Sequence, residues 1–136
     1  MAWKIFDAVD KNGVSNIANW IAKEKLGKRE IGALNQKIDM LEQHGPNLPP
    51  KILAGPIKSE KDRKLVSHIY KLRIRTDRML RPMLCKGPID GENEFTMLLG
   101  AIEKGGVLDT DSKDADEVRL AIVANPRLRE DHERYR

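Results

Sequence analysis

The chain has 136 residues, with 25 lysines and arginines against 21 aspartates and glutamates and a formal net charge of +4. This length fits one domain, residues 1–136, which can fold without disulfides or metal. The single cysteine, Cys85, excludes an internal disulfide and a CxxC metal cluster, so we expect a reducing, cytoplasmic compartment. We find no apolar run long enough for a signal peptide or a membrane span, and expect no membrane partner.

The first third of the chain predicts a strand followed by two helices. The alternation in Trp3–Val9 is typical of a strand, and the letters DKNG end it. The next helix is expected to end at Gly27, and a second one to run from about Arg29 to a cap at Gly45. Their apolar residues recur at helical spacing: Val14, Ile17, Ala18 and Ile21, then Ile31, Leu34, Ile38 and Leu41. So short a connection predicts an antiparallel helical hairpin.

Residues 45–66 are rich in proline, glycine and lysine, and predict a basic loop with a short strand at Lys51–Ala54. A loop of this length in a small domain usually has a function or is mobile. Four of its cations are candidates for nucleic-acid contact: Lys58, Lys61, Arg63 and Lys64. An ordinary solvated loop is the alternative explanation for them.

Three strand candidates and a helix follow this loop. The strands are His68–Arg75, Met79–Lys86 and Glu94–Glu103. Pro82 cannot donate a ladder hydrogen bond, so the second strand is expected to have a bulge or lie at an edge. Asp114–Ala124 predicts a helix, and the charged tail, residues 126–136, predicts a further short helix. The predicted fold class is α+β: an N-terminal strand, a two-helix hairpin, a three-stranded antiparallel meander completing one sheet, and a C-terminal helix, with the helices on one face.

Common catalytic and cofactor motifs are missing from the sequence, which has no Walker loop, GxGxxG or HExxH. His44, His68 and His132 have no metal-ligand spacing, so we expect neither a metal nor another cofactor. A Ser–His–Asp triad stays open, because its members need not be close in sequence.

The stretch HIYKLRIRTDRMLRPMLCKG, His68–Gly87, alternates like a β-hairpin, and cations fill the positions between its apolar residues. Asp77, at the turn, is its only acid. The cations are Lys71, Arg73, Arg75, Arg78, Arg81 and Lys86. Cations placed across a hairpin repel one another unless an anion lies between them, and arginine suits bidentate phosphate contacts. A nucleic-acid backbone is the obvious anion. The alternative is a solvated sheet face that discourages aggregation.

The same stretch also resembles a known toxin superfamily. The pattern HIYKLRIRTDRMLRPMLC, then EFTMLLGAIEK, then a helix containing ADEVRLAI is similar to the RelE/ParE toxins, especially to their phage-derived HigB-like branch. The matching residues are Tyr70, Leu72, Arg73 and Ile74 in one strand, Leu80 and Arg81 in the next, and Glu103 and Lys104 at the position of a lysine pair. The order of elements extends the resemblance to about residues 1–125, while the motifs are confined to about 68–104.

The resemblance implies a type II toxin that cuts mRNA on the ribosome without a metal, and a helix-turn-helix antitoxin as its partner. In such toxins the RNA 2′-hydroxyl attacks the adjacent phosphate. Cations must then stabilise the phosphorane, while a base and an acid move protons. The implied residues are Arg73, Arg81 and Lys104 at the phosphate, His132 or Glu103 as the base, and Tyr135 as the acid. Lys71 and Arg75 are neighbours on the same predicted face, with Arg78 and Lys86 as further cations of the surface.

Two other functions remain open. A non-enzymatic binder on the same scaffold, like the ParE-type gyrase inhibitors, needs the basic face but neither base nor acid. A phage accessory nucleic-acid-binding protein would show strong salt dependence and no cleavage. The position of His132 bears on this choice, because a tail that folds away from Arg73 and Arg81 takes the first candidate base away from the nuclease.

Overall fold

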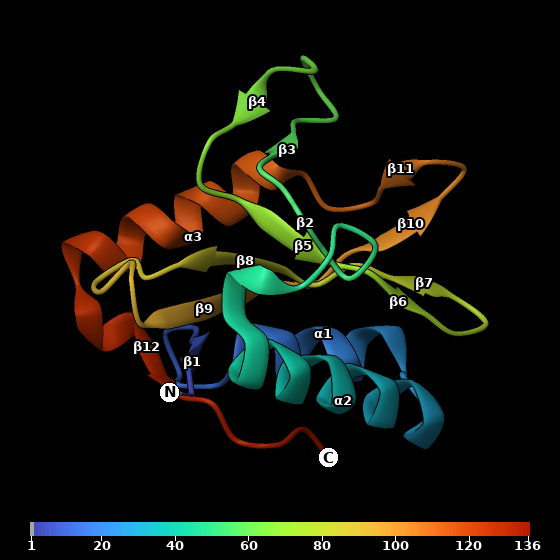
Figure 1. Ribbon diagram of the computed structural model, residues 1–136, viewed down its shortest axis with the longest axis horizontal. Coiled ribbons are helices and arrows are strands. Elements are labelled where there is room, and N and C mark those ends of the chain that lie inside the picture. The colour runs from blue at the N-terminus through green and yellow to red at the C-terminus, as the bar shows by residue number, and fades with distance from the viewer. Residues whose placement is uncertain (1) are drawn as a thin grey trace.

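The computed structural model describes residues 2–136, and shows an α+β fold in which a β-sheet layer has helices on both faces (Figure 1). Helices α1 (Asn16–Glu24) and α2 (Lys28–His44) cover one face, and α3 (Ser112–Ala124) covers the other. The prediction that all helices lie on one face is therefore wrong. The strands themselves explain why: side chains alternate between faces, and both sets are apolar in the central strands.

The main sheet has six strands in the order β12-β1-β9-β8-β5-β2. Their bounds are β1 Lys4–Ala8, β2 Leu53–Ala54, β5 Tyr70–Leu72, β8 Met83–Lys86, β9 Glu94–Leu99 and β12 Arg129–Asp131. Strand β1 is parallel to β9, and every other pair in this sheet is antiparallel. The predicted first strand and the predicted meander are both present, and the sheet is larger than the sequence suggested.

A second sheet of four strands, in the order β11-β10-β7-β6, continues the predicted strands beyond a break. Its strands are β6 Ile74–Arg75, β7 Met79–Leu80, β10 Ile102–Lys104 and β11 Val107–Leu108. The breaks fall at Arg73, at Arg81–Pro82 and at Gly100–Ala101. Pro82 has no N–H to donate, its carbonyl accepts from the backbone of Leu72, and the register shifts just after it. This confirms the expected bulge, while β8 itself is an interior strand.

Position 100, at this break, requires glycine for a steric reason on the helical side. A Cβ atom at this position would lie 1.9 Å from the ring of Trp20, so only glycine lets the strand pass beneath the side chain from α1. This close approach lies between the end of β9 and the start of β10.

The helix ends differ from the predicted ones by a few residues. Ser15 caps α1 by accepting from the backbone N–H of Ala18, and Lys25, in the left-handed conformation at φ 53°, ends it. Gly27, predicted as that cap, is instead the N-cap of α2. Val14 precedes the helix and is exposed, so it does not belong to the apolar stripe. The end of α2 at Gly45 is confirmed.

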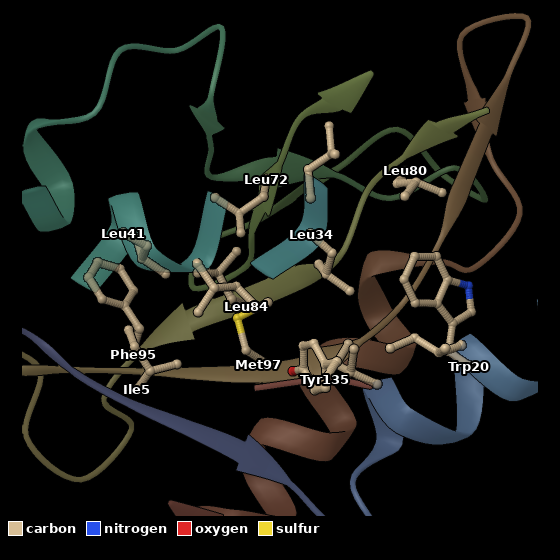
Figure 2. Packing of buried hydrophobic residues seen from close by; sticks show 14 of the residues in the cluster. Ile5, Trp20, Leu34, Leu41, Leu72, Leu80, Leu84, Phe95, Met97 and Tyr135 are labelled. Atoms are coloured by element: carbon tan, nitrogen blue, oxygen red, sulfur yellow. The ribbon is translucent and has the colours of Figure 1, made fainter. Parts of the chain in front are cut away.

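Two apolar clusters, one on each face of the sheet, form the core. The larger cluster joins α1 and α2 to the sheet through residues such as Leu34, Leu72 and Phe95 (Figure 2). The smaller one lies under α3 and contains Ile69, Met83 and Cys85. The prediction that Cys85 is a buried strand residue is confirmed.

The tail, residues 126–136, contains a short 3-10 turn, η2 (Pro126–Leu128), and then a strand, so the predicted helix is wrong. Strand β12 pairs with β1, and Tyr135 reaches the larger core cluster (Figure 2). An open edge at β1 explains this outcome, because its backbone N–H and C=O groups need partners.

The basic segment 45–66 is more regular than a loop. It begins with η1 (Gly45–Asn47) and includes β2, where the short strand was expected. A small hairpin of β3 (Ile57–Lys58) and β4 (Leu65–Val66) then rises from the sheet layer (Figure 1). None of the helices in residues 2–136 has the length and apolar character needed to cross a membrane.

Candidate nucleic-acid interface

Lys71, Arg81 and Glu103 meet at the break between the two sheets, and we call these three residues the Arg81 cluster. The Nε of Arg81 donates to Oε1 of Glu103 at 3.2 Å. The ammonium of Lys71 donates to the same oxygen at 3.5 Å, a long and weak contact. Arg81 also donates from Nη1 to the backbone carbonyl of Leu80 at 3.0 Å. The structure thus joins two predicted cations and the second candidate base.

Strand pairing explains why these three side chains share a face. Leu80 and Ile102 are opposite one another in β7 and β10, and both enter the core cluster on the α1–α2 side. Arg81 and Glu103, each one residue later, fall on the other side because side chains alternate along a strand. Lys71 is paired with Met83, which packs under α3 on that same side.

The cluster keeps unused hydrogen-bonding atoms. Neither Nη2 of Arg81 nor Oε2 of Glu103 makes a hydrogen bond within residues 2–136. The same part of the chain leaves no buried side-chain nitrogen or oxygen without a partner, so both atoms reach solvent. The side chains are nevertheless largely covered, at 8% exposure for Arg81 and 17% for Glu103. An incoming phosphate and hydroxyl would therefore meet a fixed donor and a fixed acceptor.

The two cations keep Glu103 ionised. Burial acts to raise the pKa of Glu103, but the hydrogen bond and charge of Arg81, together with the charge of Lys71, outweigh it. The pKa of Glu103 therefore lies below its ordinary value. The carboxylate can accept a proton throughout the neutral range.

Other predicted cations of the hairpin have partners of their own. Arg78 donates to both carboxylate oxygens of Glu30, at 2.9 and 2.7 Å, and to the carbonyl of Glu24, so it docks the β6–β7 hairpin on the α1–α2 turn. Arg73 donates to the carbonyl of Pro50 at 3.3 Å. The ammonium of Lys86 lies 5.7 Å above the ring of Tyr70. The expectation of an unpaired cationic face is therefore wrong for Lys71, Arg78 and Arg81.

Arg75 and Lys104 are exposed, and in residues 2–136 neither forms an ion pair. Lys104 follows Glu103 at the end of β10, opposite Val107. It is thus near the Arg81 cluster along the chain. Arg75 lies instead beside the first turn of α2, where it lines a cavity with Lys28 and Arg29.

The cations of the segment 45–66 lie on the β3–β4 hairpin, and α3 anchors this hairpin. Asp111, which caps α3, accepts from the hydroxyl of Ser59 at 3.1 Å and from the backbone of Lys61 at 3.2 Å. Asp62 forms an ion pair with Lys113. Lys58, Lys61, Arg63 and Lys64 are exposed, and Arg63 lies 3.6 Å from Glu60.

His132 and Tyr135 belong to a different group, around the buried carboxylate of Asp7. Tyr135 Oη donates to Asp7 at 2.7 Å, Ser15 Oγ donates at 2.6 Å, and His132 Nδ1 lies 2.9 Å away. Burial, and then the charge of Asp7, raise the pKa of Tyr135 well above its usual value. Ser15 and His132 both bind the acid rather than one another, so a Ser–His–Asp relay is not formed here.

Sequence reasoning gave Asp7 no role, although a signal was present. An acid inside a short strand of apolar residues is unusual, because a buried carboxylate needs partners. Its three partners come from segments far apart in the sequence, and only the fold brings them together.

His132 is remote from the Arg81 cluster. Its backbone N–H donates to the carbonyl of Ile5 in β1, and β12, which ends one residue before it, is one edge of the six-stranded sheet. Lys71 lies in β5, with β1, β9 and β8 between the two strands. Strands are about 4.8 Å apart, so the separation is on the order of 19 Å. The first candidate base is therefore not placed at the predicted phosphate site, and neither is Tyr135.

Comparison of the chain with protein-family models, with curated proteins and with solved structures gives no match in any of the three.

Proposed function

We propose that the chain is a RelE/HigB-type toxin, a metal-independent endoribonuclease of mRNA on the ribosome, and that the Arg81 cluster is its reacting site. The observation that supports this most is the open pair of atoms, Oε2 of Glu103 and Nη2 of Arg81, on one face of the sheet. A carboxylate beside two cations is the minimum that the reaction needs, namely a base and a stabiliser of charge. A helix-turn-helix antitoxin is the partner that the family resemblance adds.

In the proposed reaction, Glu103 accepts the proton of the RNA 2′-hydroxyl while the 2′-oxygen forms a bond to the adjacent phosphorus. The bond from phosphorus to the 5′-oxygen breaks, and the ammonium of Lys71 gives a proton to the leaving oxygen. Arg81 stabilises the phosphorane through its free guanidinium N–H groups. The contact between Lys71 and Glu103 then returns the proton to the amine. The products are a 2′,3′-cyclic phosphate and a 5′-hydroxyl.

Expression in growing cells tests this proposal. RNA ends mapped after induction are expected to show new cuts in translated transcripts, and these cuts are expected to disappear with Glu103→Gln. Intact transcripts together with normal growth would overturn it.

A non-enzymatic binder on the same scaffold is the second candidate, and the placement of His132 and Tyr135 favours it. Both residues contact Asp7 of β1 and not the Arg81 cluster, so the nuclease lacks its first base and its predicted acid. If the protein is a binder, the wild type is expected not to cleave RNA, and Arg81→Ala is expected to weaken binding to the target. The nuclease predicts that Glu103→Gln leaves RNA binding intact and abolishes the cut.

A further inference from the structure

A second cationic surface lies at the turn between α1 and α2, where the end of β6 meets the first turn of α2. It consists of Lys25, Lys28, Arg29 and Arg75, and we call it the α1–α2 basic patch. All four side chains are exposed, and none forms an ion pair within residues 2–136. Lys28, Arg29 and Arg75 line one open cavity of about 510 Å³. Its two acids are Glu30, which Arg78 engages, and Asp77.

Contacts of neighbouring residues, rather than of the four cations, hold the backbone around the patch in place. Arg78 binds both oxygens of Glu30 and the carbonyl of Glu24, which ties the β6–β7 hairpin to the turn (Figure 1). The hydroxyl of Thr76 also reaches Glu30, at 3.5 Å. These contacts place the backbone of Arg75 beside α2, and its guanidinium makes no hydrogen bond within residues 2–136.

Helix stability does not explain the two cations of α2. Lys28 and Arg29 occupy the first turn of α2, where the helix dipole disfavours positive charge. Lys25 differs from these two, because its left-handed backbone caps α1 and its charge suits the C-terminal end of that helix. Residues that lower helix stability without making a compensating structural contact are typical of functional surfaces.

We propose that the α1–α2 basic patch binds the phosphate backbone of folded, double-stranded RNA. Unpaired cations around an open cavity fit phosphates, which dominate affinity for nucleic acid. The cavity has no aromatic lining residue on which single-stranded bases could stack, so a duplex backbone is the better fit. The choice of RNA over DNA rests on the proposed function, whereas the location of the surface does not. A ribosome-bound toxin would hold ribosomal RNA here and mRNA at the Arg81 cluster.

The test is fluorescence polarisation with a labelled RNA duplex of about 20 base pairs, long enough to span a typical protein footprint. The double variant Lys28→Glu with Arg29→Glu is expected to bind at least tenfold more weakly at about 0.1 M salt. Its slope of log affinity against log salt is expected to fall by about two. Because acids suit the first turn of a helix, its melting temperature is expected to equal or exceed that of the wild type. If the variant binds RNA more weakly but melts at no lower temperature, misfolding is excluded as the cause of the weaker binding.

The matched control is Lys11→Glu with Arg127→Glu, which changes the net charge equally at exposed positions away from the patch. It is expected to keep most of the affinity. An equal loss in the control, unchanged binding by the patch variant, or tighter binding to a DNA duplex of the same sequence would each overturn the proposal. Glu103→Gln is expected to bind the duplex like the wild type, so a failure of cleavage alone counts against the proposed function and not against this surface.

Discussion

The Nε of Arg81 donates to Oε1 of Glu103 at 3.2 Å, from one broken strand to its neighbour. Both residues lie where the six-stranded and four-stranded sheets meet. Arg81 is almost fully covered, yet one of its guanidinium nitrogens still reaches solvent. The two residues form an ion pair that supports the fold, and each keeps one polar side-chain atom open to solvent. Substitutions can separate the contribution to stability from the proposed contribution to catalysis.

Replacing Glu103 with glutamine is expected to lower the single-turnover rate of RNA cleavage by about 10²–10⁴-fold, because an amide cannot take the hydroxyl proton. Glutamine keeps the shape of the side chain, so RNA affinity should change little. Rates measured with excess protein, alongside a binding titration, give both quantities. A rate loss that tracks an equal loss of affinity would assign Glu103 to binding alone.

Replacing Arg81 with alanine is expected to lower the free energy of unfolding by about 2–3 kcal/mol, since Glu103 and the carbonyl of Leu80 lose a charged donor. Lysine at the same position keeps the charge, and about half of the loss should be recovered. Urea titrations of the two variants make the comparison. Two variants as stable as the wild type would mean that the pair contributes nothing to the fold.

The lowered pKa of Glu103 also predicts how stability depends on pH. Its folded pKa lies below its unfolded one, so its contribution is present above the unfolded pKa and is lost as pH falls through the folded pKa. The difference in unfolding free energy between wild type and Glu103→Gln should be constant near neutral pH and shrink below about pH 4. A difference that grows on acidification would contradict the assignment.

Tyr135 shows what the buried carboxylate of Asp7 does for the tail. Tyr135→Phe removes a 2.7 Å hydrogen bond to a charged acceptor and should cost about 1.5–3 kcal/mol. Because the pKa of Tyr135 is raised, this contribution is present below the unfolded pKa of about 10 and is lost as pH rises beyond it. Limited proteolysis should cut the variant's tail sooner than that of the wild type. Equal resistance in both would show that the tail is held by other contacts.

Burial raises the pKa of the Cys85 thiol to about 12. The thiolate is the reactive form, so the native protein should resist alkylation at neutral pH and react only when it unfolds. Iodoacetamide labelling, followed by mass spectrometry with and without denaturant, checks this. Rapid labelling of the native protein would show that the strand opens readily under α3.

The sequence predicted elements better than their arrangement. The apolar stripe of α2 and the alternation in β1 predicted those elements because their periodicity reflects burial directly. The sequence could not show that helices cover both faces of the sheet. Ile69 and Leu72 are both apolar residues of one predicted strand, and nothing in the sequence tells which helix covers each of them. The tail was predicted as a helix from its charged local sequence. Its backbone pairs instead with β1, and such a long-range interaction leaves no local signal in the sequence.

The candidate site was predictable in part. Strand alternation brought Lys71 and Arg81 to one face, and the motif position drew attention to Glu103. Their pairing was not foreseen, because it depends on the breaks at Pro82 and Gly100 that set neighbouring strands in register. Asp7 was missed, since its partners Ser15, His132 and Tyr135 are brought together by tertiary folding alone.

We propose that the Arg81 cluster cuts RNA by attack of the 2′-hydroxyl. The most direct measurement is the chemistry of RNA ends formed on purified translating ribosomes, with Glu92→Gln, an exposed glutamate of the β8–β9 turn, as the matched control. Wild type and the control are expected to leave 2′,3′-cyclic phosphates and 5′-hydroxyls, and Glu103→Gln is expected to leave uncut mRNA. Undiminished cutting by Glu103→Gln, or no cutting by the wild type, would contradict the account.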